Sequence, residues 1–318
     1  MLIRHDWNVS EARALYDLPL FDLIDRSRAV LLECHPKNVV QLCALLSVKT
    51  GGCPEDCGYC AQSSRHGVTQ PQPMLSVDAV LERARRAKER GSTRFCMGTA
   101  WRGPRDGAAF DRVLEMIRGV KALGLETCVT LGLVDEAHAR RLKEAGLDNY
   151  NHNLDTSREF FPKITSTRRF DDRIETIRNI RRAGISVCSG GIIGMGETID
   201  DRCSLLCELS ALDPHPDSVP INALVAIPGT PLESQPPIDP VEVVRMIAVA
   251  RIMLPRSMVR LSAGRSKLTQ EAQLLCMYAG ANSIFYGEKL LTTPNVTNSA
   301  DDELLAVAGL RGQAPNPH

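Results

Sequence analysis

Residues 43–66, CALLSVKTGGCPEDCGYCAQSSRH, start as a short β-rich run and end in a loop that carries three cysteines at the spacing C-x3-C-x2-C. A loop that follows the first strand directly lies at the carboxyl ends of the strands, where α/β barrels build their active sites. A closed metal site normally takes four ligands. The three cysteines therefore leave one position to be filled by something else.

Seven further β-rich runs follow along the chain, and helical patterns separate them. The eight runs span residues 43–49, 93–98, 126–132, 148–153, 185–194, 217–225, 258–263 and 281–287. The helical stretch 77–90 has Ser76 before it and Gly91 after it, and the stretch 135–145 ends at Gly146, as helix start and stop signals require. Strands that alternate with helices pair in parallel through right-handed crossovers. Eight such units predict an α/β fold, a (β/α)8 barrel of the TIM type.

The pattern divides the chain into three parts. Residues 1–41 are predicted to form an N-terminal helical extension of two short helices that cap the barrel, with Ser10 as an N-cap. Residues 42–292 form the barrel. Residues 293–318 show little periodicity, and we expect them to form a short C-terminal tail that is partly mobile.

The balance of charges narrows the classes of function. Lysine plus arginine and aspartate plus glutamate number 38 each among 318 residues, so no overall field attracts nucleic acid or an anionic membrane. The start lacks the pattern of a secretion signal, no apolar run approaches about 18 residues, and we expect a soluble, cytoplasmic protein. In a reducing compartment the eleven cysteines serve metals or catalysis more often than disulfides.

From the residues alone, three interpretations of the cysteine loop stay open. Structural zinc would need a fourth tight ligand, and His66 is the nearest candidate. Four irons in an iron-sulfur cluster normally take four thiolates, so three cysteines would leave one iron open as a reactive position. The cysteines could also be incidental.

Three more cysteines lie within the predicted strands. Cys96, Cys128 and Cys188 occupy equivalent heights on the second, third and fifth of them. Each could point into the lumen or out toward the helices, and a buried cysteine is by itself a small apolar filler. Arg260, in the seventh strand, must be paired or liganded because an unpaired buried charge is costly. Either an acidic neighbour or a metal site would meet this requirement of Arg260.

The loop CPEDCGYC, with an aromatic residue before its last cysteine, resembles that of the radical S-adenosylmethionine enzymes. From about Ser10 to Asn295 the chain resembles the biotin synthase family, most specifically in GGCPEDCGYCAQSSRH, YNHNLDTS, VCSGGIIGMGET, INALVAIPGTPLE, RLSAGR and YGEKLLTTPN. The stretch EFFPKITSTRRF is less diagnostic. The resemblance implies that Cys53, Cys57 and Cys60 hold a 4Fe-4S cluster whose fourth iron is chelated by S-adenosylmethionine.

The same resemblance implies a second cluster deep in the barrel. In the family, three strand cysteines and an arginine hold a 2Fe-2S cluster, and they match Cys96, Cys128, Cys188 and Arg260. The residues that the resemblance assigns to catalysis are thus Cys53, Cys57, Cys60 and Arg260. Cys203 and Cys207, four residues apart on a predicted helix, are expected to be small buried residues. No partner pattern connects the remaining cysteines outside the two predicted sites: Cys34, Cys43, Cys203, Cys207 and Cys276.

The resemblance also assigns residues to the cofactor and the substrate. Those assigned to S-adenosylmethionine are Tyr59, Asn153, Asp155, Arg173, Gly190, Ile192, Gly194 and Glu197. Arg173 could equally be a solvent-facing arginine of a helix, and the glycines an ordinary loop. Those assigned to the ureido ring of dethiobiotin are Asn151, Asn153 and Asn222. Amide side chains suit a cyclic urea because each offers both a donor and an acceptor. His152, between two of them, is expected to be structural.

The implied activity is conversion of dethiobiotin to biotin. The reduced 4Fe-4S cluster would cleave S-adenosylmethionine to a 5'-deoxyadenosyl radical, that radical would remove hydrogen from dethiobiotin, and the 2Fe-2S cluster would donate the sulfur. A flavodoxin-type electron donor and a homodimer are implied as well. Three alternatives remain: a methylornithine or hydrogenase-maturation type enzyme, which should lack the barrel cysteines; lipoyl synthase, which needs another cysteine motif; and a zinc-stabilised binding protein without turnover.

Overall fold

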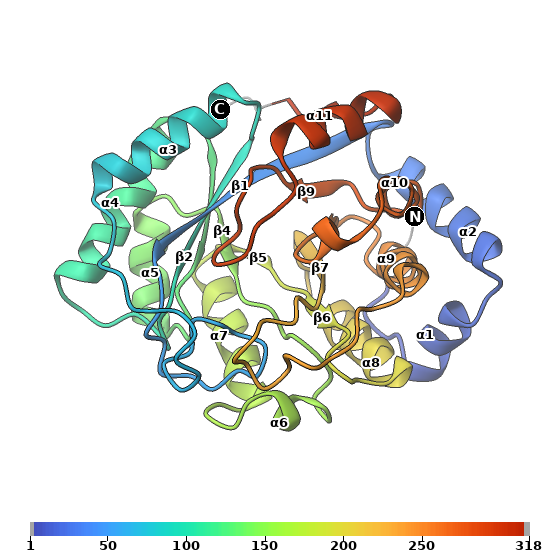
Figure 1. Cartoon of the computed structure of the whole chain (residues 1–318), viewed down its shortest axis with the longest axis horizontal. Coiled ribbons are helices and arrows are strands. Elements are labelled where there is room, and N and C mark those ends of the chain that lie inside the picture. Colours follow the sequence, from blue (N-terminus) through green and yellow to red (C-terminus); the bar gives the residue numbers. More distant parts are fainter. Residues whose placement is uncertain (1–2, 315–318) are drawn as a thin grey trace.

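The strands of the computed structural model, which describes residues 3–314, close into a barrel with helices around it (Figure 1). The strands are β1 (Val39–Lys49), β2 (Arg94–Thr99), β3 (Glu126–Thr130), β4 (Asn149–Asn151), β5 (Ser186–Cys188), β6 (Gly191–Ile193), β7 (Ser218–Ala223), β8 (Met258–Leu261), β9 (Ser283–Phe285) and β10 (Arg311–Gly312).

Parallel pairing runs around the barrel in sequence order. β1 pairs with β2, the following strands continue the circle, and β9 returns to β1. β5 and β6 share one position in the circle, because both pair with β7, through Cys188↔Ser218 and Gly191↔Ile221. The short β10 pairs with the start of β1. The predicted (β/α)8 barrel, with eight parallel strand positions, is confirmed.

The helices form the outer layer (Figure 1). They are α1 (Val9–Tyr16), α2 (Leu20–Cys34), α3 (Val77–Glu89), α4 (Ala108–Ala122), α5 (Glu136–Glu144), α6 (Phe161–Ile164), α7 (Phe170–Arg182), α8 (Ile199–Ser210), α9 (Pro240–Met253), α10 (Gln270–Tyr278) and α11 (Asn298–Val307), with a 3-10 turn at Arg265–Lys267. The predicted start signal at Ser76 is confirmed, since its side chain accepts from the Ala79 N–H at 3.3 Å. At the start of α5 the side chain of Asp135 accepts from the His138 N–H at 2.8 Å.

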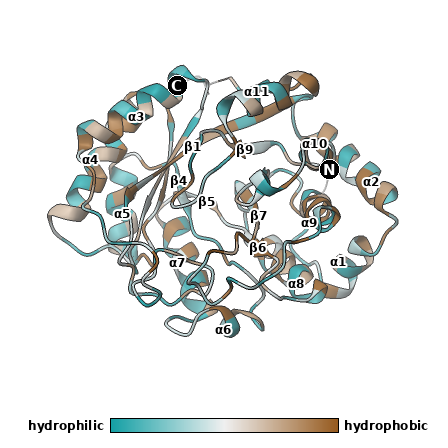
Figure 2. Ribbon diagram, in the orientation of Figure 1, coloured by the Kyte–Doolittle hydropathy of each residue, from teal (hydrophilic) through white to brown (hydrophobic). Residues whose placement is uncertain are grey.

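The two predicted N-terminal helices are present and pack on the outer helical layer. α1 contacts α8 and α9, and α2 contacts α9. Figure 2 accordingly shows α9 as mainly hydrophobic, whereas the outward-facing α3 carries many hydrophilic residues. The N-cap of α1 is Asn8, so the prediction of Ser10 was wrong. Asn8 and Glu11 form a capping box, in which each side chain accepts from the other's backbone N–H.

The fifth predicted run, residues 185–194, is interrupted between β5 and β6. A Cβ on Gly190 would lie 2.0 Å from the carbonyl oxygen of Pro220, so the two backbones approach more closely than any other residue would allow. Glycine inside a strand often marks such a close approach. The interruption follows from the packing of β7 against this segment, which a run of β-forming residues does not reveal.

The segment after Thr293 is more ordered than expected. α11 begins after Thr297, whose side chain accepts from the Ala300 N–H at 3.3 Å. Asp301 in this helix is fully buried and pairs with the equally buried Arg265 at 2.6 Å. The expectation of little regular structure was therefore wrong for this helix. Residues 315–318, at the end of the predicted tail, lie outside the described residues, and the proposed domain boundaries stay predictions.

Among residues 3–314, no helix combines the length and the apolar character that crossing a bilayer requires.

Candidate functional site

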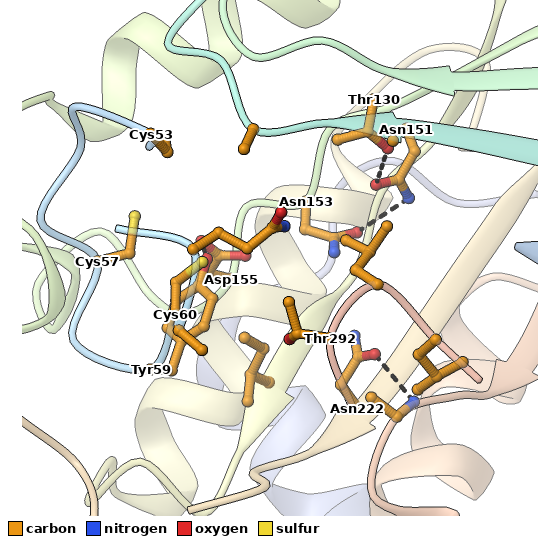
Figure 3. A pocket seen from close by; sticks show the side chains of 18 of the residues that line it. Cys53, Cys57, Tyr59, Cys60, Thr130, Asn151, Asn153, Asp155, Asn222 and Thr292 are labelled. Carbon is orange, nitrogen blue, oxygen red and sulfur yellow. Dashed lines mark hydrogen bonds between the residues drawn. The ribbon is translucent and has the colours of Figure 1, made fainter. Parts of the chain in front are cut away.

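A cavity of about 320 Å³ opens at the carboxyl ends of the barrel strands. Its walls come from the loop after β1, from the ends of several strands and from residues 290–293. Figure 3 shows Cys53, Cys57 and Cys60 on one side of this space and Asn151 and Asn222 on the other. A cavity of this size with a few convergent polar groups suits a small ligand.

The three-cysteine loop is fixed by backbone hydrogen bonds. The Cys53 N–H donates to the Gln62 carbonyl at 2.9 Å, and the Cys60 N–H donates to the Cys57 carbonyl at 2.9 Å. The Gly58 N–H donates to the Ile164 carbonyl at 2.8 Å, which ties the loop to the end of α6. As predicted from their spacing, the three thiols lie together at the cavity wall.

The thiols at this wall suit an iron-sulfur cluster better than zinc. Nε2 of His66 lies 3.1 Å from the carbonyl oxygen of Cys57 and so is engaged by backbone. With His66 so engaged, structural zinc would lack the nearest candidate for its fourth ligand. A donor set made only of thiols is the set that iron-sulfur clusters take.

Burial shapes the protonation of these thiols. Desolvation raises the pKa of Cys60 to about 12 and also raises the pKa of Cys53. A coordinated thiol is deprotonated outright, so a cluster held by these thiols would have to displace their protons.

Arg168 beside these thiols was not identified from the sequence. Its Nη2 lies 2.9 Å from the Sγ of Cys57, and its side chain is largely buried. Burial by itself would lower the pKa of Arg168, but the Cys57 thiol, Tyr59 and the nearby carboxylates raise it. Its stretch, EFFPKITSTRRF, contains adjacent arginines and gives no signal that selects one of them.

Asp155 connects the cysteine loop to the barrel. It is buried and adopts a left-handed backbone conformation at φ 69°, which is uncommon outside glycine and clusters at functional sites. The Tyr59 hydroxyl donates to Asp155 Oδ2 at 2.6 Å, and Arg173 donates to the same oxygen. Arg173 also donates to the Asn153 carbonyl. Arg173 is thus buried in the cavity wall, and the alternative of a solvent-facing arginine is wrong.

The three predicted asparagines line the cavity, and Figure 3 shows their amides around it. Asn151 Nδ2 donates to the Cys188 sulfur at 3.2 Å, and its Oδ1 accepts from Thr130 at 3.2 Å. Asn153 Oδ1 accepts from a backbone N–H at 3.2 Å. Asn222 spans two strand ends, since it donates to one carbonyl at 2.9 Å and accepts from one N–H at 3.1 Å.

The segment 190–197, assigned to S-adenosylmethionine by the resemblance, divides into two parts. Ile192 lines the cavity. Glu197 turns away from it, because its carboxylate accepts from the Gly194 and Met195 N–H groups at 2.9 and 2.7 Å and pairs with Arg202 at 2.7 Å. Glu197 therefore shapes the turn that presents Ile192. Its assignment to the cofactor stays a prediction.

The structure brings the deep residues together inside the barrel. Cys96 and Cys128 are register partners on β2 and β3, and both are buried with Cys188. The pKa of Cys96 is lowered by a hydrogen bond from Cys128, whose own pKa is raised because it keeps the proton. Cys96 reaches the cavity, so this group lies at the cavity floor.

Arg260 is fully buried at the same level. Its Nε donates to Ser283 Oγ at 3.0 Å, and its Nη1 lies 3.9 Å from the Cys188 sulfur. Its guanidinium also lies 4.7 Å from the ring centroid of Phe285. Among the described residues no carboxylate pairs with Arg260, which removes the alternative of an acidic neighbour. A cation surrounded by thiols fits the predicted cluster site.

Two features of the site were missed. Nη2 of Arg260 donates to the Sγ of Cys43 at 3.2 Å, whereas the sequence assigns no partner to Cys43. Residues 290–293 line the cavity and include Thr292, which Figure 3 labels. The only sequence signal for this segment was its place in the stretch YGEKLLTTPN.

The comparisons with known proteins agree on the family. The model of the radical SAM superfamily matches residues 47–206, and that of the biotin and thiamin synthesis associated domain matches residues 220–311. The chain is 67% identical to a biotin synthase of Sorangium cellulosum over 98% of this chain and 90% of that protein. It is 57% identical to a biotin synthase of Myxococcus xanthus over 98% of this chain and 91% of that protein.

Solved structures show the same fold at low sequence identity. Methylornithine synthase matches with a TM-score of 0.82 at 22% identity, over 97% of this chain and 94% of that chain. The FeFe-hydrogenase maturase HydG from Carboxydothermus hydrogenoformans matches with a TM-score of 0.81 at 18% identity, over 96% of this chain and 76% of that chain. These two likenesses support the fold alone, whereas the relatives at 57–67% identity distinguish among radical S-adenosylmethionine enzymes. The chain belongs to the biotin synthase family.

Proposed function

We propose that this enzyme inserts sulfur into dethiobiotin to form biotin, with S-adenosylmethionine as cofactor. One observation carries the proposal: two groups of thiols lie at two depths of one barrel, and amide side chains line the space between them. A single cavity can therefore hold a cofactor at its outer wall and a substrate above its floor.

The outer group would hold the 4Fe-4S cluster through Cys53, Cys57 and Cys60, and the inner group would hold the 2Fe-2S cluster through Cys96, Cys128, Cys188 and Arg260. When bound, the outer cluster supplies an electron for cofactor cleavage and the inner cluster supplies the sulfur. Tyr59, Asn153 and Asp155 are positioned to bind the cofactor, because all three line the cavity beside the cysteine loop. Arg173 holds Asp155 and the Asn153 backbone in place.

The asparagines are positioned to orient the substrate. Each amide keeps a further donor hydrogen or acceptor lone pair beyond its protein contacts, and a cyclic urea needs both kinds of partner. Asn151 also donates to the Cys188 sulfur at 3.2 Å, so a substrate held by Asn151 lies close to the inner thiols. Positioning matters here because a primary radical attacks nearly any C–H bond that it reaches.

We infer that residues 290–293, which line the cavity, limit the access of water to a bound substrate. Leu291 packs against the strand residue Gly98, where an added Cβ would lie 2.7 Å from Leu291 Cδ2. The Leu290 N–H donates to the Thr293 carbonyl at 2.9 Å and keeps this segment folded. Exclusion of water protects a reactive intermediate from side reactions.

An anaerobic assay tests the activity directly. The purified protein, reconstituted with iron and sulfide, is incubated with dethiobiotin, S-adenosylmethionine and a flavodoxin-type reductant. We expect about six irons per chain, together with biotin and 5'-deoxyadenosine. Colourless protein that retains zinc and forms neither product would refute the proposal.

The electron donor, the oligomeric state and the compartment belong to the same proposal. We infer a flavodoxin-type donor, a homodimer and a cytoplasmic location from the family. α2 supports the homodimer with the exposed apolar residues Phe21 and Leu32, which are 74% and 45% exposed. Thiols that must stay reduced suit a cytoplasmic enzyme. Light scattering coupled to gel filtration should give twice the 34.9 kDa chain mass, and a monomer would contradict the homodimer.

A further inference from the structure

Cys43 lies inside the barrel beside Arg260, which also reaches the inner thiol of Cys188. It is fully buried on β1, directly next to the closing strand β9, where it is the register partner of Phe285. On the other side β1 pairs with β2, which carries Cys96 two residues beyond the register partner of Cys43. Cys43 is thus one of four buried cysteines that surround the same space.

One guanidinium links Cys43 to the predicted cluster ligands. Nη2 of Arg260 lies 3.2 Å from the Cys43 sulfur, and Nη1 of the same side chain lies 3.9 Å from the Cys188 sulfur. The Cys43 sulfur also lies 3.7 Å from Ser283 Oγ, the group that receives the Nε hydrogen of Arg260. The Cys43 thiol and the Arg260 guanidinium therefore occupy the same corner of the site.

The two groups differ greatly as iron ligands. Arginine is normally protonated, has donors only, and must lose a proton before a nitrogen can bind a metal. A thiolate is a soft anionic ligand and is the usual ligand of iron-sulfur clusters. Where a thiolate and an arginine lie beside the same iron position, the thiolate can complete a set of four ligands without the arginine.

We propose that Cys43 is an alternative fourth ligand of the inner cluster, able to take the iron position that the family resemblance assigns to Arg260. The inference rests on the proposed function, because it assumes that Cys96, Cys128 and Cys188 hold a 2Fe-2S cluster. It adds a residue that the family resemblance did not assign. In this chain the inner cluster then has two exchangeable partners at one corner, one cationic and one anionic.

The test compares the variants Arg260→Leu, Cys43→Ala and the double variant after anaerobic reconstitution. Iron and acid-labile sulfide per chain, the visible absorption spectrum and the Mössbauer spectrum of the 2Fe-2S cluster are measured. We expect Arg260→Leu to keep its inner cluster within about twofold of the unsubstituted protein, with a four-thiolate spectrum. Cys43→Ala should keep it through Arg260. The double variant should contain at least about fivefold less of the inner cluster, because only three of its four ligands remain.

Two controls separate ligand loss from misfolding. The 4Fe-4S content of each variant reports on the folded outer site in the same sample. Cys276→Ala combined with Arg260→Leu removes a fully buried thiol from α10 and should match Arg260→Leu alone. Loss of the inner cluster from Arg260→Leu, or equal retention by the double variant, would overturn the role of Cys43 and leave the proposed function standing. An unsubstituted protein without any 2Fe-2S cluster would overturn both.

Discussion

Arg168 places a positive charge directly against one thiol of the cysteine loop. Its Nη2 lies 2.9 Å from the Cys57 sulfur, and Glu55 lies behind it at 3.8 Å from Nε. Glu55 is itself buried and accepts from Arg102 at 2.7 Å. Hydrogen bonds and charges near cluster sulfurs are among the terms that set reduction potentials. In the proposed site the Arg168 side chain would act on the cluster through Cys57 rather than as a ligand.

We expect Arg168→Gln to lower the reduction midpoint of the 4Fe-4S cluster by on the order of 60 mV, a tenfold change for one electron. The reason is that a cation beside the cluster stabilises the added electron, and glutamine removes that cation. A redox titration followed by electron paramagnetic resonance measures the midpoint.

The neighbouring arginine provides the control. Arg169 has a side chain that is 83% exposed and pairs with Asp172 at 3.3 Å, so Arg169→Gln should leave the midpoint unchanged. Arg168→Lys should recover part of the loss, because the charge is kept. If Arg168→Gln and Arg169→Gln gave the same midpoint, the charge of Arg168 would have no part in tuning the cluster.

Single residues were predictable where spacing or a motif marked them. The cysteine loop is local, so three thiols within one loop could be recognised from their spacing alone. Arg168 meets Cys57 across 111 residues, and Arg260 meets Cys43 across 217 residues. Only the closure of the barrel brings these pairs together, and no sequence period connects them. A lone cysteine such as Cys43 is indistinguishable from an apolar filler until its neighbours are known.

At the scale of elements, the buried pair of Arg265 and Asp301 ties α11 to the barrel. The pair is bidentate, at 2.6 and 2.7 Å, and both side chains have zero exposure. Arg265 also donates to the Phe285 carbonyl at 2.8 Å, at the end of β9. α11, which follows the cavity segment 290–293, is therefore held against β9, the strand that precedes this segment.

We expect Asp301→Asn to lower the free energy of unfolding by about 3–5 kcal/mol, the cost of leaving one buried charge without its partner. Urea unfolding at neutral pH, followed by circular dichroism, measures the change. Asp302→Asn is the matched control. Asp302 is exposed and only accepts from the Tyr286 hydroxyl at 2.7 Å, so its change should stay below about 1 kcal/mol. Equal losses in the two variants would mean that the ion pair does not fasten the helix.

Most elements could be predicted, and the exceptions have physical causes. The alternation of strands and helices was visible because each unit carries its own caps and apolar face. β1 begins at Val39, before the predicted start at residue 43, because Gln41 and Leu42 pair with Ser283 and Ile284 of β9. α11 was missed because five of its ten side chains are acidic or polar, and because its anchor, Arg265, is far from it in sequence.

At the scale of the whole molecule, the lumen is arranged in levels. Across the amino ends of the strands lies an ion pair between Arg94 and Glu126, at 2.7 Å, with Asn149 donating to the same carboxylate at 2.7 Å. The inner thiols lie above this pair, since Cys96 follows Arg94 by two residues on β2. The asparagines and the cysteine loop come next, toward the open end. The order of the strands in the barrel could be predicted from the sequence. The depth of each level could not be predicted, because it depends on the register between the strands.

This arrangement predicts that the two thiol groups fail in different ways. Cys57→Ala should abolish S-adenosylmethionine cleavage, because two thiols cannot hold the outer cluster. Cys188→Ala removes a thiol from the cavity floor and leaves the outer wall intact, so some cleavage should persist while biotin formation is lost. Chromatographic quantification of 5'-deoxyadenosine and biotin from the same anaerobic reaction separates the two outcomes. Equal loss of 5'-deoxyadenosine in both variants would contradict the division of roles between the two depths, since cleavage would then depend on the floor of the cavity as much as on its mouth.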